Sequence, residues 1–189
     1  MSVIHEARQV GQFDEDIVLV ERVLAGDEDA FQTVFERYHD KVFSIALGVL
    51  LDRDEAADAV QEIFTLVFRN LKKFDGRSRF STWLFRVAVN RSIQQARKTK
   101  YKKLSVPLNE AAENVESEKV DPVVDPDIEV AMASLHPADR AMLTLFYWDE
   151  LSLLEIAESL GCSPNAAKTR LFRARERFRL QYEEVAGNA

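Results

Sequence analysis

The residues between positions 74 and 91 combine aromatic and arginine side chains in a way that suits nucleic acid. The stretch reads FDGRSRFSTWLFRVAVNR, and no other part of the chain is so hard to explain as ordinary core. Aromatic rings stack on unpaired bases and guanidinium groups hold phosphates, so the combination is typical of a surface for single strands. Alternatively, Phe80, Trp83 and Phe85 are core residues and the arginines form a solvated face. The stretch alone leaves both interpretations open.

A loop followed by a helix must position these side chains. Asp75 and Gly76 are turn residues, and Ser78 can bond its own backbone. The pattern predicts a helix that begins near Ser81. Residues 83–89 are apolar nearly all round, so more than one side of this helix must contact something other than water.

A second candidate surface lies near the C-terminus, where residues 151–178 read LSLLEIAESLGCSPNAAKTRLFRARERF. Ser152 can cap one helix, and Gly161 supplies the positive backbone angle that ends it. Ser163 then caps the next helix, with Pro164 at its first position. Two helices joined by so short a turn form a helix-turn-helix, which often binds DNA. The alternative is a plain helical hairpin.

The second helix of this pair has an apolar side and a polar side. The inward positions are Ala167, Leu171, Ala174 and Phe178. The outward positions lie in the N-terminal half, where a recognition helix contacts base edges, and they are Asn165, Lys168, Thr169, Phe172 and Arg173. Further positive charge, directed towards phosphate, comes from Arg175, Arg177 and Arg179.

Two earlier helices complete a first bundle. Asp27 can cap a helix whose apolar residues recur with the helical period, and Asp52 can cap the next one. In this next helix Asp58, Gln61 and Glu62 share a face that is turned away from the apolar stripe. A polar helical face is usually only solvated, and no neighbouring motif supplies a nucleophile, a metal ligand or a phosphate loop.

Charge is unevenly distributed along the chain. The net charge of −7 argues against nucleic-acid binding if it is taken alone. However, Asp75 is the only acid between residues 69 and 103, and residues 168–179 are again basic. Between residues 110 and 129 the only base is Lys119. Two local positive fields can therefore attract phosphate despite the acidic total.

Several functional classes are not expected. Cys162 is the only cysteine, which rules out an intramolecular disulfide and a multi-cysteine metal site. The longest apolar run, residues 45–51, is too short to span a bilayer, and the N-terminus carries no secretory signal. We therefore expect a cytoplasmic protein with no membrane insertion. We expect no catalytic residue, no metal and no cofactor either, because the scattered histidines lack supporting ligands: His5, His39 and His136.

The predicted fold class is all-α, with two small helical domains joined by a flexible acidic linker. No window shows the sustained alternation of a β-strand, and helix-favouring residues are common. Prolines and acids are concentrated between residues 105 and 127, which is typical of a linker. The predicted segments are an N-terminal segment (1–24), a three-helix domain (25–100), the linker (101–127), a helix-turn-helix domain (128–184) and a C-terminal tail (185–189).

Both domains resemble one protein family. The run LDRDEAADAVQEIFTLVFRNLKKFDGRSRFSTWLFRVAVNR is similar to region 2 of bacterial sigma-70 factors, and residues 151–179 are similar to region 4. The lack of a large domain between them resembles the extracytoplasmic-function (ECF) group. The resemblance implies a subunit that directs core RNA polymerase to promoters and helps to melt them. From the residues alone, the other interpretation is a stand-alone helix-turn-helix regulator.

The resemblance also implies roles for the residues already described. Asp58, Gln61 and Glu62 match the DxxQE positions that dock on the β′ clamp helices, and region 4 is expected to contact the β flap. The expected minus-10 contacts are Arg77, Ser78, Phe80, Trp83, Arg86 and Asn90. The expected minus-35 contacts are Asn165, Lys168, Thr169, Phe172 and Arg173. An anti-sigma partner is also implied.

The chain departs from the family pattern at the start of its recognition helix. The family often has the residues GTV where this chain has Asn165, Ala166 and Ala167. The resemblance therefore does not define the upstream promoter sequence that this chain would read.

Overall fold

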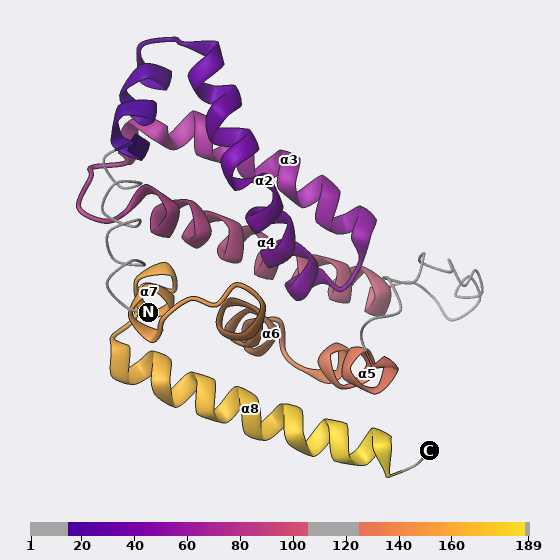
Figure 1. Cartoon of the computed structure of the whole chain (residues 1–189). Helices are drawn as coiled ribbons and strands as arrows, with labels where there is room; N and C mark the ends of the chain where they lie inside the picture. Colours follow the sequence, from indigo (N-terminus) through magenta and orange to yellow (C-terminus); the bar gives the residue numbers. More distant parts are fainter. Residues whose placement is uncertain (1–14, 106–124, 188–189) are drawn as a thin grey trace.

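The structure, a computed structural model, describes residues 15–105 and 125–187. The all-α prediction is confirmed, because these two ranges contain helices and turns but no strand. The first range begins with a helix over residues 15–24. The other helices, labelled in Figure 1, are α2 (Glu28–Leu50), α3 (Arg53–Asn70), the 3-10 turn η1 (Leu71–Lys73), α4 (Phe80–Ser105), α5 (Pro126–Ser134), α6 (Pro137–Leu143), the π-helical turn η2 (Thr144–Trp148), α7 (Leu153–Ser159) and α8 (Pro164–Ala186).

Capping side chains begin the first helices where the sequence predicts. The Asp27 carboxylate accepts a hydrogen bond from the Ala30 amide at 3.1 Å, and the Asp52 carboxylate accepts one from the Glu55 amide at 2.8 Å. Such bonds satisfy amides that lack a partner within the helix. Leu51 takes a left-handed conformation (φ 61°) between the two helices, so that α3 folds back against α2.

The first domain is a bundle with one more helix than predicted. Its core comes mainly from α2, α3 and α4, and the helix over residues 15–24 adds Leu19, Val20 and Val23. Asp16, in the first turn of this helix, is buried and accepts hydrogen bonds from Arg37, at 2.8 Å, and from the Tyr38 hydroxyl. The prediction that residues 1–24 lie outside the domain is therefore wrong for residues 15–24, whereas residues 1–14 lie outside the described ranges.

The second domain is built on the long helix α8, against which α5, α6 and α7 pack. Ser152 and Glu155 form a capping box at the start of α7. Gly161 ends this helical turn with φ 61°, and Ser163 caps α8 with Pro164 in its first turn. The predicted helix-turn-helix is confirmed at each of these positions.

The two domains pack against each other in this structure. Figure 1 shows α6 and α7 lying between α8 on one side and the bundle of α2, α3 and α4 on the other. Their buried residues form a single hydrophobic cluster. Among the described residues, ion pairs cross the boundary from Lys41 to Asp149 at 3.3 Å and from Arg79 to Glu155 at 3.5 Å. The sequence analysis did not predict this contact between domains.

The helices also extend into the predicted linker. Helix α4 continues to Ser105, because residues 101–105 favour helix and contain neither Gly nor Pro. Helix α5 begins at Pro126, and Asp125 caps it by accepting a hydrogen bond from the Asp127 amide at 3.0 Å. The rest of the predicted linker, residues 106–124, lies outside the described ranges.

Candidate functional site

The polar face of α3 is exposed, as its spacing predicts. Asp58, Gln61 and Glu62 all lie on the surface, where Glu62 pairs with Arg91 of α4. Sequence reasoning missed Phe68, which is 55% exposed and lies two turns beyond Gln61 on the same face. The ring of Phe68 meets that of Phe31 edge to face, with centroids 5.2 Å apart. Its position outside the apolar stripe of α3 could have shown from the sequence that Phe68 is exposed.

Phe80 belongs to the core of the first domain. Phe80 is only 1% exposed, and its ring packs among those of Tyr38, Phe74 and Trp83. Phe85 is buried as well. In this structure the Phe80 ring has no face free for a base, so the expectation of a minus-10 contact is corrected at this position. The core interpretation describes Phe80 and Phe85, whereas Trp83 remains half-buried at the edge of the cluster.

The loop before α4 presents one exposed arginine. Arg77 donates from its side chain to the Asp75 carboxylate at 2.6 Å, and its side chain remains 87% exposed. Hydrogen bonds from the Arg77 amide and guanidinium lower the pKa of the Asp75 carboxyl. Gly76 lies between them with φ 70°, a conformation that favours glycine. Ser78 follows, half-buried. The loop thus offers a guanidinium at its tip.

The remaining predicted minus-10 residues lie on the side of α4 that faces the second domain. The Arg86 guanidinium packs against Gly161, where an added Cβ would lie 3.0 Å from its Nη2 atom. Asn90 lines a groove of about 800 Å³ together with residues of α8, including Arg170 and Arg177. The structure therefore brings Arg86 and Asn90 close to the helix-turn-helix and separates them from Arg77 at the loop tip.

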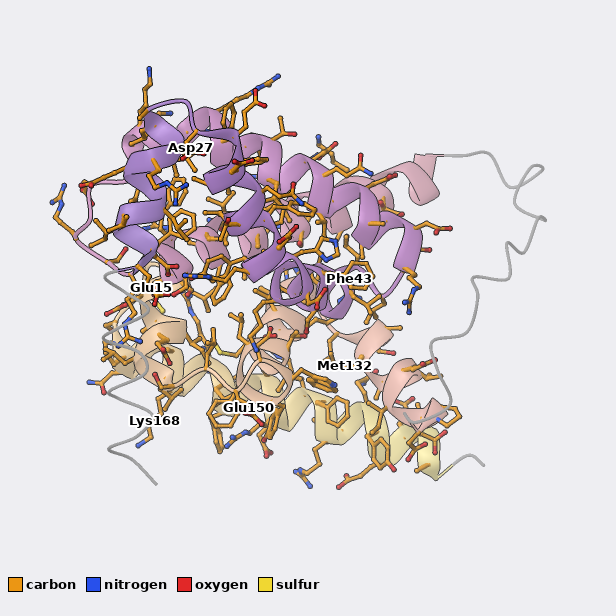
Figure 2. All side chains as sticks on the ribbon, turned by 45° about the horizontal axis from the view of Figure 1, so that its top comes forward. Glu15, Asp27, Phe43, Met132, Glu150 and Lys168 are labelled. Carbon is orange, nitrogen blue, oxygen red and sulfur yellow. The ribbon has the colours of Figure 1, made fainter. Side chains whose placement is uncertain are left out.

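The outward face of α8 is exposed at every predicted position. Asn165, Lys168, Thr169, Phe172 and Arg173 all lie on the surface, and Phe172 is 64% exposed. Their inward counterparts Ala167, Leu171 and Ala174 are buried. Figure 2 shows Lys168 on the side of the second domain that is turned away from the bundle of α2, α3 and α4. The predicted orientation of α8 is confirmed, and the contact with bases stays a prediction.

The three later arginines of α8 differ in their partners. Arg177 donates to both carboxylate oxygens of Asp139, at 2.9 and 2.7 Å. Arg179 pairs with Glu176 and Glu183, each at 3.1 Å. Arg175 has no ion pair among the described residues and instead stacks over the aromatic rings of η2, 4.9 Å from the Phe146 centroid and 5.2 Å from the Tyr147 centroid.

Comparison with known proteins accounts for both domains. Residues 34–101 match Sigma-70 region 2, and residues 127–178 match Sigma-70 region 4. The chain is 33% identical over 179 residues to the ECF RNA polymerase sigma factor SigW of Bacillus subtilis (strain 168), covering 88% of this chain and 96% of that protein. The chain belongs to the ECF RNA polymerase sigma factors. It is therefore a promoter-directing factor, and the stand-alone regulator is not favoured.

Other relatives agree with this assignment. The ECF RNA polymerase sigma-E factor of Escherichia coli (strain K12) is 35% identical over 181 residues, which cover 85% of this chain and 91% of that protein. Among solved structures, CnrH in complex with the cytosolic domain of CnrY has a TM-score of 0.63 at 20% identity, covering 88% of this chain and 96% of that chain. At this identity the structural likeness supports the fold alone.

Two further findings concern only the part of the chain that the structure describes. Within residues 15–105 and 125–187, no group of His, Cys, Asp and Glu side chains is arranged to hold a metal ion. In the same ranges, every helix is too short or too polar to cross a bilayer.

Proposed function

We propose that this sigma factor gives core RNA polymerase its promoter address through three separate surfaces and contributes no catalytic residue. The observation that carries the proposal is the presence, in one chain, of regions 2 and 4 with the polar faces of α3 and α8 both exposed. The test is transcription in vitro by purified core polymerase on a pool of random promoters. We expect new start sites when the chain is added, and an unchanged set of start sites would contradict the proposal.

The proposed docking surface is the exposed face of α3. Asp58, Gln61 and Glu62 would contact the β′ clamp helices, and Phe68 would add an apolar anchor to the same face. Buried aromatic anchors surrounded by polar contacts carry much of the binding energy in protein interfaces. Region 4 would hold the β flap, so that the polymerase positions both DNA-binding regions.

The proposed melting surface comprises the loop before α4 and the exposed side of that helix. Trp83 keeps part of its ring accessible, and Arg77, Ser78, Arg86 and Asn90 would hold the single strand. Opening DNA costs about 1.4 kcal/mol per stacked step. Stacking one base on an aromatic ring returns about 1 to 3 kcal/mol. A few captured bases can therefore hold a small bubble, although Phe80 is too deeply buried to capture one.

The proposed minus-35 surface is the outward face of α8. Asn165, Lys168, Thr169, Phe172 and Arg173 would reach base edges in the major groove. Among the later arginines, Arg175 is the proposed phosphate contact, because its charge is not compensated by a carboxylate within the described ranges. The Phe146 and Tyr147 rings would hold its guanidinium in place by cation–π attraction.

We further propose that the chain acts in the cytoplasm and is controlled by an anti-sigma partner. A similar solved structure, with a TM-score of 0.60 and 22% identity, is the sigma factor RpoE in complex with the anti-sigma factor NepR from Bartonella quintana. The structural match covers 83% of this chain and 96% of the RpoE chain. Copurification of the chain with a partner that abolishes transcription in vitro would test this part of the proposal.

A further inference from the structure

We propose that Asn165 reads an adenine in the minus-35 element. This contact rests on the proposed minus-35 function of α8 and deepens it, because it assigns one base preference to one residue. Asn165 stands where the family pattern often has glycine, which has no side chain for base readout. The preference would therefore distinguish the promoters of this chain from those of relatives with glycine at the same position.

Helix α8 presents Asn165 at its N-terminal end. Ser163 caps the helix and Pro164 begins it, so Asn165 lies in the first turn. Asn165 is exposed on the same side of the helix as Thr169 and Phe172, which follow at helical spacing. The N-terminal residues of a recognition helix are those that contact base edges in the major groove. Asn165 is therefore positioned to meet a base.

The side-chain amide of Asn165 is available for binding. The capping bond at this end is already made by Ser163, whose hydroxyl accepts a hydrogen bond from the Ala166 amide at 3.2 Å. Within residues 15–105 and 125–187, no group is hydrogen-bonded to the Asn165 side chain. Its amide offers an acceptor oxygen and a donor nitrogen. Adenine presents the complementary pair, the N7 acceptor and the N6 donor, and an asparagine can bind both at once.

The other outward residues of α8 lack this combination of groups. Lys168 and Arg173 carry donors only, which match the two acceptors of guanine. The Thr169 hydroxyl donates to the Asn165 carbonyl at 3.0 Å, so Thr169 keeps an acceptor and a methyl group for DNA. Phe172 is apolar and 64% exposed, which suits the thymine methyl group. Among these five residues, the chemistry of Asn165 is the match for adenine.

A phosphate oxygen is the competing target for the Asn165 amide, since asparagine also contacts the DNA backbone. The two targets have different consequences. A base contact changes the preference at one position of the element, whereas a phosphate contact changes the affinity for all sequences about equally. The effect of a substitution on each base position therefore separates the two.

Selection of promoters from a randomised pool by the holoenzyme tests the base preference. The wild type should enrich adenine at one position of the minus-35 element, and Asn165→Ala should reduce this enrichment by at least about fivefold. Asn165→Asp should instead favour cytosine at the same position, because a carboxylate accepts a hydrogen bond from the cytosine N4 amino group. The side chain is exposed, so circular dichroism should show unchanged helix content in both variants.

A base analogue tests the hydrogen bonds themselves. Replacing the selected adenine by 7-deazaadenine removes the N7 acceptor and keeps the Watson–Crick edge. The wild-type holoenzyme should bind this promoter about fivefold more weakly, whereas Asn165→Ala, which lacks the amide, should bind both promoters equally. As a control, the same analogue placed between the two promoter elements should leave both proteins unaffected.

Two results would overturn the assignment of Asn165. One is an Asn165→Ala holoenzyme that binds all sequences more weakly and keeps the wild-type base preferences, as loss of a phosphate contact would produce. The other is an equal response of the wild type and Asn165→Ala to 7-deazaadenine. In both cases the chain still directs polymerase to new start sites, so the proposed function would stand. Absence of any new start site would contradict the proposed function, and the assignment with it.

Discussion

Region 2 and region 4 differ in how they present the residues predicted to contact DNA. On α8 a buried side and an exposed side divide the residues cleanly, and Phe172 is 64% exposed. On α4 the predicted contact residues are not divided in this way. Phe80 lies in the core, whereas Arg86 lies against region 4. A helix that reads duplex DNA needs only one face, whereas a melting surface at a loop-to-helix corner shares its aromatic side chains with the core. This difference predicts opposite consequences for similar substitutions.

The largest expected contrast is between two phenylalanines. Phe80→Ala should lower the free energy of unfolding by about 3 to 5 kcal/mol, because it removes a buried ring from the aromatic cluster of region 2. Phe172→Ala should change stability by less than about 0.5 kcal/mol, since its ring is already exposed, but it should weaken binding to minus-35 duplexes. Urea unfolding of the full chain measures the first effect, and equal losses of stability would contradict the division.

Reversing one charge on α3 should separate polymerase docking from DNA binding. Glu62→Lys places a cation on the docking face beside Arg91, and we expect at least about tenfold weaker binding to core polymerase. Asp40→Lys is the matched control, because Asp40 is fully exposed on α2, away from that face. Titration of labelled chain with core enzyme measures both. Normal binding by Glu62→Lys would show that α3 does not dock.

Within α8, Arg175 and Arg177 should respond differently to salt. Arg175→Ala should weaken binding of the holoenzyme to different promoters about equally and reduce the slope of log affinity against log salt by about 1, as loss of one phosphate contact does. Arg177→Ala should leave the slope unchanged, because its charge is already paired with Asp139. Anisotropy titrations over a range of salt concentrations measure the slope. Identical slopes for both variants would exclude the assignment of Arg175.

The smallest expected effect concerns Asp149 of region 4, which is buried beside Lys41 of α2. Asp149→Asn removes a poorly compensated buried charge, so it should raise the free energy of unfolding by about 1 kcal/mol. In the wild type this group should make stability rise as the pH falls, because burial raises the pKa of the Asp149 carboxyl and the folded state therefore binds its proton more tightly than the unfolded state does. Lys41 is the only cation paired with Asp149 within the described ranges. Urea unfolding at several pH values should show a weaker pH dependence in the Asn variant.

The parts of the fold that depend on local chemistry could be predicted from the sequence. Asp27, Asp52, Ser152 and Ser163 cap helices as expected, because a capping bond involves only neighbouring residues. The exposed faces of α3 and α8 followed from helical periodicity in the same way. The helix over residues 15–24 could also have been found, since its buried residues Leu19, Val20 and Val23 have helical spacing.

The parts that depend on tertiary packing could not be predicted. An aromatic residue beside an arginine can be core or surface, and only the positions of Tyr38 and Phe74 show that Phe80 is core. The packing of region 4 against α2 brings Gly48 and Thr144 together from distant parts of the chain, and neither residue carries a local signal for such a contact. Contacts of this kind depend on how whole domains fit together.

The most direct test of the two-region account is to select active promoters from a randomised pool with the holoenzyme and compare variants of each region. Trp83→Ala should change base preferences and opening only at the minus-10 element, with activity restored on a premelted template. Arg173→Ala should change preferences only at the minus-35 element. If either substitution altered the other region's element, or if the selected promoters were the same with and without this chain, the account would be contradicted.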